Sequence, residues 1–206
     1  PMSSFLSGNL ADALRHAETA DRLVAEASDD ELAEWLDAVA WLCWAEHMMG
    51  RYGASRRHFE RAVSVARGTG QSYILAPLLT GQARASTMEG RLTEAAMIAE
   101  EAVETARLLG AAPQLAGALT QQSLTIGLTG DAKEALRLAE EALRAGADGG
   151  EWYGAQAQYA KARALLDLSQ VDAGVEAMMT ACNGFGEVIL LDYDTRLACC
   201  EIMAEV

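Results

Sequence analysis

The stretches GRLTEAAMIAEEAV (90–103) and GDAKEALRLAEEAL (130–143) decide the fold, because the second repeats the pattern of the first 40 residues later. Both open on glycine, and both place alanine at the same three positions. Residues three and four apart lie on one face of an α-helix, so the alanines form a small-residue face that lets two helices approach closely. The matched positions are Ala95, Ala99 and Ala102 in the first stretch and Ala135, Ala139 and Ala142 in the second.

The same pattern recurs on both sides of this pair. GRYGASRRHFERAV begins at Gly50, QVDAGVEAMMTACN begins at Gln170, and a fifth copy, GNLADALRHAETAD, begins at Gly8. The repeating unit is predicted to be a helix, a tight turn and a second helix. The first helix of each full unit is expected over Glu31–Met49, Tyr73–Glu89, Pro113–Thr129 and Glu151–Leu168.

The ends of these stretches carry helix start and stop signals. SDDE (28–31) has the pattern of a capping box, and Pro113 suits the first turn of its helix. Gly50, Gly90 and Gly130 each follow a helix, where a left-handed turn residue is favoured. Pro77 conflicts with a helix that starts at 73, so it either kinks this helix or moves its start.

One helix pair cannot bury its apolar surface alone, whereas stacked pairs can. We therefore expect an all-α fold, a right-handed superhelical solenoid of antiparallel helix pairs, as a single repeat domain over 1–206. The nearest approach to a strand pattern is GEVILLDY (186–193). The copy at Gly8 has no preceding partner helix, and the last helix, from near Asp192, stops before the closing turn that the period predicts near position 210, so a fragment of a longer protein is expected. The units are placed near 8–30 (partial), 31–70, 71–110, 111–150, 151–190 and 191–206 (partial).

The charge balance of the chain disfavours two classes of partner, nucleic acids and anionic membranes. The net charge is −14, with 16 Lys and Arg against 30 Asp and Glu, which disfavours direct binding to nucleic acid or to anionic membrane surfaces. The N-terminal residues lack the basic and apolar segments of a signal peptide. The four cysteines form no CxxC pair, and reduced thiols in a cytoplasmic protein are the simpler interpretation.

These repeats resemble a known class. TGDAKEALRLAEEAL (129–143) is similar to the tetratricopeptide pattern, although the 40-residue period is longer than the roughly 34 residues of that repeat. AEHMMGRYGASRRHFERAVSVARGTG (45–70) and EGRLTEAAMIAEEAVETARLLG (89–110) resemble the middle part of large ATP-binding LuxR-type transcriptional regulators of the maltose-activator type. The resemblance implies a sensing segment between an ATPase module and a helix-turn-helix, and neither a P-loop nor a basic recognition helix occurs in this sequence.

WLCWAEHMMG (41–50) is the stretch richest in reactive side chains. Cys43, Glu46 and His47 could offer metal ligands, but a closed zinc site needs about four, and the stretch lacks the HExxH pattern. Cys43 also aligns with Ala83 and Ser123, as expected of a small position in a helix crossing. Cys43 and His47 have no third group to orient them as a catalytic pair. We therefore predict no enzyme activity, no metal and no cofactor.

The concave surface is the predicted site of binding. In tetratricopeptide-like solenoids the first helix of each pair lines this surface, and the repeat register predicts which residues lie there. An aromatic ring, one cation, hydroxyls and small side chains suit a peptide or a small polar ligand, or the docking of a protein domain. The inward column contains Asp37, Ala40, Trp44 and His47, then Thr80, Arg84 and Thr87, then Thr120 and Leu124, and last Ala164 and Asp167.

The predicted function is that of a non-catalytic regulatory or sensor module, within a LuxR-type transcriptional regulator. Its partners would be other domains of that regulator, a protein or a peptide, and a small-molecule inducer remains open. Two alternatives fit the same repeats: a free-standing tetratricopeptide scaffold or adaptor, and a peptide-sensing repeat receptor.

Overall fold

The computed structural model describes residues 1–147, 150–185 and 193–205, and these residues form helices and turns without a strand. The all-α fold class is therefore confirmed for the described residues. The strand-like stretch at 186–193 lies almost entirely outside them. The chain divides into two compact units, Pro1–Arg91 and Leu92–Val206, and each is described by itself. Within the described ranges, every helix is too short or too polar to serve as a transmembrane span.

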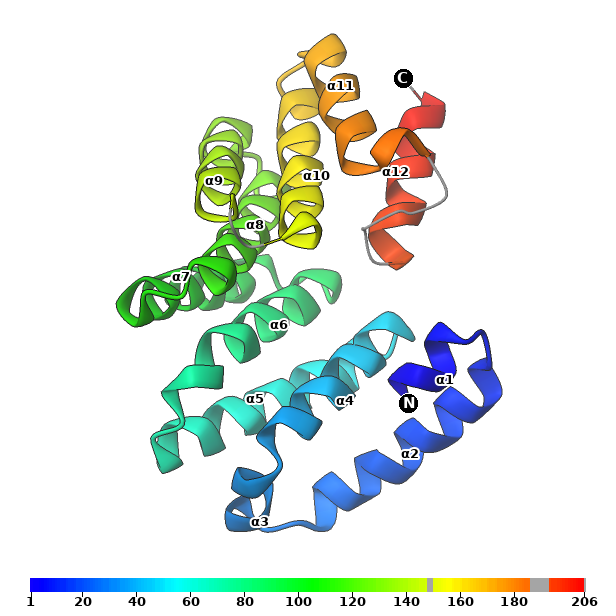
Figure 1. Cartoon of the computed structure of the whole chain (residues 1–206), viewed down its shortest axis with the longest axis vertical. Coiled ribbons are helices and arrows are strands. Elements are labelled where there is room, and N and C mark those ends of the chain that lie inside the picture. Colours follow the sequence, from blue (N-terminus) through cyan, green and yellow to red (C-terminus); the bar gives the residue numbers. More distant parts are fainter. Residues whose placement is uncertain (148–149, 186–192, 206) are drawn as a thin grey trace. The chain divides into compact units, whose positions relative to one another are not determined.

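Unit 1 contains six α-helices and one 3-10 turn (blue to teal in Figure 1). Helix α5 packs against both α4 and α6, while the short α1 and the longer α2 lie against each other and against α4. Asn9 caps α2, and Ser28 and Glu31 form the predicted capping box of α3. The elements are α1 (Met2–Leu6), α2 (Leu10–Glu26), α3 (Asp29–Glu34), α4 (Leu36–Met48), α5 (Tyr52–Thr69), η1 (Ser72–Ile74) and α6 (Leu75–Met88).

The helix predicted over Glu31–Met49 is broken in two. Trp35 leaves the helical conformation at φ −125° and ψ 22°, so α3 ends before it and α4 begins after it. Arg61 of α5 fastens α3 and the end of α2. Its guanidinium donates to the carbonyls of Val24 and Ala27, the latter at 2.6 Å, and pairs with Asp29 at 3.0 Å.

Pro77 moves the start of the second long helix. The segment Ser72–Ile74 forms a 3-10 turn, and α6 begins at Leu75, so the proline falls in its first turn. No hydrogen-bonded backbone N–H is needed there, which makes that position compatible with proline.

Unit 2 is built from successive antiparallel helices (green to red in Figure 1). Each helix from α7 to α10 packs on the next, and α8 also contacts α10. A buried cluster that includes Tyr159, Met178 and Cys199 joins α10, α11 and α12. The elements are α7 (Leu92–Leu109), α8 (Ala112–Leu128), α9 (Ala132–Ala145), α10 (Glu151–Asp167), α11 (Val171–Ala181), η2 (Asn183–Phe185) and α12 (Tyr193–Glu205).

The predicted glycine turns are confirmed. Gly50, Gly90 and Gly130 have φ of 73°, 75° and 98°, each between two helices. A second series, not predicted, lies 20 residues after each of them: Gly70, Gly110 and Gly150 have φ of 71°, 63° and 92°. A side chain is strained at such angles, so the chain places glycine where it reverses direction.

The fourth copy is one residue out of the predicted register. Helix α10 ends at Asp167, and Ser169 takes the left-handed conformation at φ 60°, one residue before the position expected from Gly130. Consequently Gly174, and not Val175, is the counterpart of Ala135. A Cβ at Gly174 would lie 2.7 Å from the side chain of Leu166, so this crossing is closer than the alanine crossings.

Small residues at the helix crossings are buried as predicted. Ala95, Ala99 and Ala102 have no exposed surface. The structure adds a hydrogen bond at one such position in each unit. Ser55 Oγ of α5 donates to the Cys43 carbonyl of α4 at 2.8 Å. The matching bond two repeats later runs in the opposite direction, from the first helix of the pair to the second. Ser123 Oγ of α8 donates to the Ala135 carbonyl of α9 at 2.7 Å.

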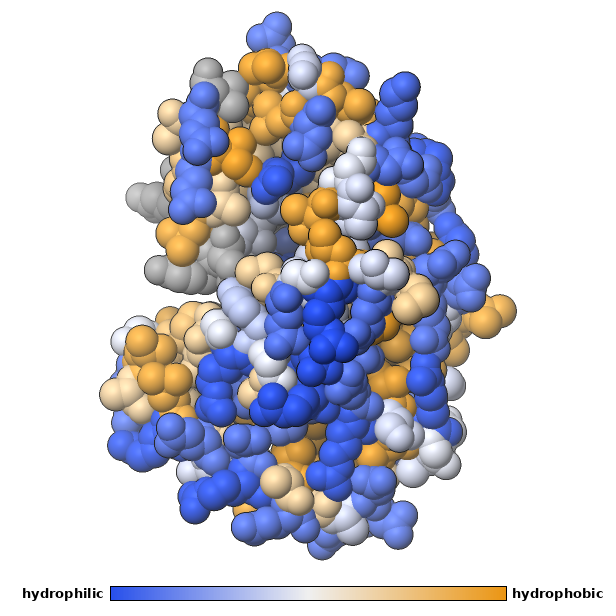
Figure 2. Space-filling model, turned by 180° about the vertical axis from the view of Figure 1, so that it is seen from behind, coloured by the Kyte–Doolittle hydropathy of each residue, from blue (hydrophilic) through white to orange (hydrophobic). Residues whose placement is uncertain are grey.

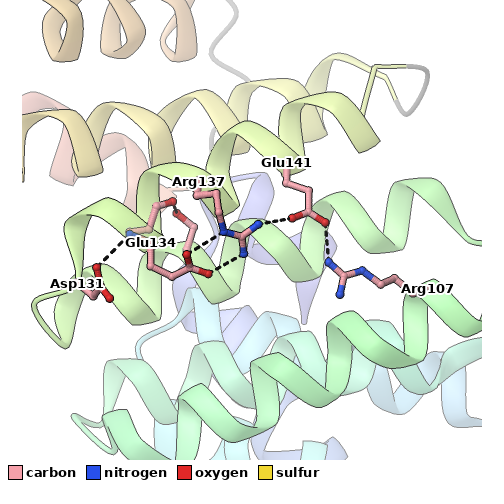
Figure 3. Close-up of polar contacts among 7 residues, drawn as sticks. Arg107, Asp131, Glu134, Arg137 and Glu141 are labelled. Atoms are coloured by element: carbon pink, nitrogen blue, oxygen red, sulfur yellow. Dashed lines mark hydrogen bonds and ion pairs between the residues drawn. The ribbon is translucent and has the colours of Figure 1, made fainter.

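An ionic network links α7 to α9 on the surface of unit 2 (Figure 3). Glu141 accepts from Arg107 of α7 at 2.6 Å and from Arg137 at 2.9 Å, and Arg137 also pairs with Glu134. Burial favours the neutral form of Glu141, but the hydrogen bonds from the two arginines lower its pKa below the ordinary value. The same contact with Arg137 lowers the pKa of Glu134, while the Asp131 side chain caps α9.

Candidate ligand-binding face

Helices α4 and α6 of unit 1 are joined by two of the predicted site residues. Arg84 Nε of α6 donates to His47 Nε2 of α4 across 3.0 Å. Arg84 is partly exposed, whereas His47 is 2% exposed. This hydrogen bond therefore holds the guanidinium of Arg84 against α4.

Trp44 lies beside this pair, and part of its ring is packed inward. Its ring meets those of Phe59 and His47 edge to face, with centroids 5.7 Å and 5.9 Å apart. Such pairs stabilise the fold in addition to burying area. Trp44 is half-buried, so one part of the indole contributes to the core of unit 1 and another part remains at the surface.

His47 occupies a different environment from the one predicted. Trp44 covers one side of the imidazole and Tyr52 lies 5.1 Å away between ring centroids. Because the ring is almost completely buried, it does not present itself to a ligand on this face. Its observed role is to hold Arg84.

Two aromatic residues that sequence reasoning did not place in the column are more exposed than Trp44. Trp41 is 64% exposed and lies one helical turn from Asp37. Tyr73 donates its hydroxyl to Asp37 Oδ2 at 3.5 Å. Partial desolvation, together with the Asp37 carboxylate, raises the pKa of Tyr73 above its ordinary value. The signal for Trp41 was its spacing of four from Asp37 in the sequence.

The threonines of α6 contribute small, partly buried positions. Thr80 Oγ1 donates to the Ala76 carbonyl at 2.9 Å, and Thr87 Oγ1 donates to the Ala83 carbonyl at 2.8 Å. These bonds to the preceding turn satisfy the hydroxyl protons. Ala40, one repeat before Thr80, is also half-buried.

We call the set Asp37, Trp41, Trp44, Tyr73, Thr80, Arg84 and Thr87 the α4/α6 face.

Two of the predicted residues of unit 2, Thr120 and Ala164, are held inside its helix packing. Thr120 is 5% exposed and donates to the Ala116 carbonyl, and Leu124 packs against the buried cluster of α10 to α12. Ala164 is buried, while Asp167 is exposed at the end of α10. Because the register shifts by one residue here, the counterpart of Leu124 is Arg163 and not Ala164.

The three candidate ligands in 41–50 do not converge on one point. Cys43 is fully buried, and desolvation, with the nearby Glu46 charge, raises the pKa of its thiol well above the ordinary value. A thiol in that state is a poor nucleophile and a poor metal ligand. Glu46 instead faces His58 of α5, with 2.7 Å between Oε2 and Nδ1.

The surface also carries scattered apolar side chains. Figure 2 shows one face of the molecule, where hydrophobic residues lie among hydrophilic ones. In unit 1 the large exposed ones include Leu23 and Trp35, and in unit 2 they include Met97 and Leu108. Scattered apolar residues are normal on a protein surface, so their presence alone does not define a site.

Solved structures with the same fold are helical-repeat proteins. A Rap protein in complex with Competence and Sporulation Factor matches with a TM-score of 0.76 and 16% identity, over 99% of this chain and 62% of that one. The apo form of RapI matches with a TM-score of 0.68 and 13% identity, over 87% and 65%. A Podosopora anserina putative kinesin light chain with nearly identical TPR-like repeats matches with 0.64 and 18%, over 87% and 89%.

These matches establish a tetratricopeptide-like helical-repeat fold and, at such low identity, nothing finer. The chain spans less than two thirds of the length of the two Rap proteins. No protein-family model matches the sequence, and the comparison with curated proteins finds no match.

Proposed function

We propose that this chain is a non-catalytic regulatory module that binds a peptide or protein segment on the α4/α6 face. The observation that carries the proposal is the exposed indole of Trp41, one helical turn from Asp37, which accepts a hydrogen bond from Tyr73. The same helix, α4, also holds Arg84 through His47. Exposed aromatic rings and an oriented arginine are the side chains that contribute most at protein interfaces.

The fold likeness supports a peptide as the partner. One similar structure is the Rap conjugation gene regulator of plasmid pLS20 in complex with the Phr* peptide, matched with a TM-score of 0.68 and 16% identity over 88% of this chain and 50% of that one. A peptide-sensing repeat protein is therefore the form of the proposal that this comparison favours over a scaffold alone.

The proposal includes a regulator as the protein context. The residue resemblance of 45–70 and 89–110 to LuxR-type ATP-binding transcriptional regulators supports it. Reading the gene on both sides of this segment tests the context directly. A P-loop upstream and a helix-turn-helix downstream support a LuxR-type protein, whereas a chain with neither supports a free-standing adaptor.

Binding is tested by selecting peptides from a random phage-displayed library on the purified chain. Selected peptides should bind Trp41→Ala at least about tenfold more weakly, because an interface aromatic residue typically contributes about 1–2 kcal/mol or more. Asp37→Asn should also weaken binding. Trp152→Ala is the matched control, since Trp152 is an exposed tryptophan of α10 in unit 2.

Thermal melting of each variant establishes that the fold is intact. Peptides that bind the parent chain, Trp41→Ala and Asp37→Asn with equal affinity would show that the α4/α6 face is not the binding surface. A selection that enriches no binding peptide would count against the proposed peptide partner itself.

A further inference from the structure

Three helices of unit 1 bring two carboxylates and an imidazole to one point. Asp21 comes from α2, Glu46 from α4 and His58 from α5, and one ligand atom of each lies within 4.8 Å of the others. His58 Nδ1 is 2.7 Å from Glu46 Oε2, and Nε2 is 3.0 Å from Asp21 Oδ1. The α4/α6 face uses none of these residues.

Glu46 is the member whose burial is unusual. Its side chain is completely buried, and Oε1 accepts no hydrogen bond. The cation beside it is Arg51, whose Nη2 lies 3.8 Å from this oxygen and 3.5 Å from Asp21 Oδ2. A buried carboxylate oxygen without a donor is costly, so this position favours a closer positive charge than Arg51 provides.

We propose that Asp21, Glu46 and His58 bind a divalent transition-metal ion of the Zn²⁺ or Co²⁺ type. One imidazole nitrogen and two carboxylate oxygens form a donor set that such ions accept, and three protein ligands leave a further position for water. Mg²⁺ and Ca²⁺ prefer oxygen ligands throughout, so the histidine disfavours them.

Metal binding requires the ligand atoms to close toward one point. Around a tetrahedral ion with metal–ligand bonds of about 2.0–2.2 Å, two ligand atoms lie about 3.3–3.6 Å apart, so the widest pair, which now lies within 4.8 Å, closes by up to roughly 1.5 Å. The imidazole now lies between the carboxylates, so the ring also turns until one nitrogen and both carboxylate oxygens face the ion, and any proton on that nitrogen passes to solvent. The ion then balances the two carboxylate charges, and Arg51, which is partly exposed, moves toward solvent.

The site has an entrance and a structural consequence. The Asp21 side chain is 37% exposed, so an ion can reach the cluster from solvent, while Glu46 closes it on the inner side. Because the three ligands come from three helices, a bound ion connects α2 directly to α4 and α5. Binding should therefore stabilise unit 1 against heat as well as fill the site.

The test uses the full chain with Cys200→Ser, because Cys200 is exposed and its thiol would otherwise compete for the ion. After dialysis against a chelator, Co²⁺ is titrated while its visible absorption bands are recorded. One Co²⁺ per chain with nitrogen- and oxygen-type bands, displaced by Zn²⁺, is the expected result. A higher melting temperature in Zn²⁺ than in chelator should accompany it.

Variants identify the ligands. Glu46→Gln and Asp21→Asn should each weaken Co²⁺ binding by about tenfold or more, and His58→Gln should change the absorption spectrum. Asp21→Asn remains informative if the buried substitutions unfold, because Asp21 is partly exposed. His16→Gln is the control, since His16 lies elsewhere on α2, beside Ser4. Absence of bound Co²⁺ at neutral pH, or binding that Asp21→Asn leaves unchanged, would overturn the assignment.

Discussion

At the scale of single residues, Phe59 and Gly81 form a matched pair in unit 1. Phe59 occupies the repeat position that is alanine at Ala99 and Ala139, and its side chain is fully buried. Gly81 of α6 makes room for it, because a Cβ at Gly81 would lie 2.2 Å from the phenyl ring. A large side chain on one helix is thus accommodated by the absence of one on the next.

Replacing Gly81 with alanine should therefore destabilise unit 1. Overpacking of this kind typically costs about 1–3 kcal/mol, and urea unfolding would show it as a lower midpoint. The same change in a Phe59→Ala background should cost much less, since the added methyl group then enters free space.

Gly68→Ala is the control for this substitution. Gly68 lies in α5 with nothing within 4 Å of an added Cβ, so alanine there should stabilise the helix by about 0.5–1 kcal/mol. An equal cost of Gly81→Ala in the parent chain and in the Phe59→Ala background would show that contact with the ring is not the cause.

Residue-level prediction from the sequence succeeded where position follows from local spacing. The small column at Cys43 and Ser123 and the alanines near Ala95 are buried at helix crossings. It did not identify the partners of Glu46 or His47, because Asp21, His58 and Arg84 approach them from other helices. Such contacts depend on how helices pack, which periodicity within one helix does not specify.

At the scale of elements, the turns determine the register of the repeat. Gly130 and its two earlier counterparts take the left-handed conformation without cost, whereas Ser169 takes it with a side chain present. A residue other than glycine in this conformation costs roughly 1–2 kcal/mol. The turn between α10 and α11 is therefore more strained than the turn between α8 and α9.

Ser169→Gly should stabilise the chain by about 0.5–1 kcal/mol, less than the full strain because glycine also gains freedom in the unfolded state. The urea midpoint of unfolding measures the gain. Gly130→Ser, at the matched turn, should produce a loss of similar size. A loss on Ser169→Gly would mean that the serine side chain stabilises this turn in another way.

The break at Trp35 shows what the sequence does not reveal about elements. Neither glycine nor proline occurs between Ser28 and Met49, and the apolar pattern continues through the break. Pro77 is the opposite case, because its fixed φ and missing N–H predicted a changed helix start, and α6 begins two residues before it. Local chemistry thus identifies a boundary only where a residue imposes one.

At the scale of the whole molecule, the division into two units has a spectroscopic consequence. Trp35, Trp41 and Trp44 belong to unit 1, while Trp152 belongs to unit 2. Stability in a repeat array is a sum of local terms, so two units need not unfold at the same denaturant concentration.

In a Trp152→Phe background, tryptophan fluorescence reports unit 1 alone, whereas far-ultraviolet circular dichroism reports the helices of both units. Gly81→Ala should then lower the fluorescence midpoint in urea by about 1 M, with a smaller shift in the dichroism midpoint. Coincident midpoints before and after the substitution would show that the chain unfolds in one cooperative step.

The spacing of the turns also bears on how the chain can be edited. Helix α7 begins two residues after Gly90, and α9 begins two residues after Gly130. Excision of residues 91–130 would therefore join Gly90 to Asp131. The left-handed turn, the start of the next helix and its alanine face would keep the spacing that they have in the parent chain. Tandem duplication of the same segment preserves them equally well. Gene rearrangement can thus lengthen or shorten such a chain in steps of 40 residues while the register of its turns stays the same.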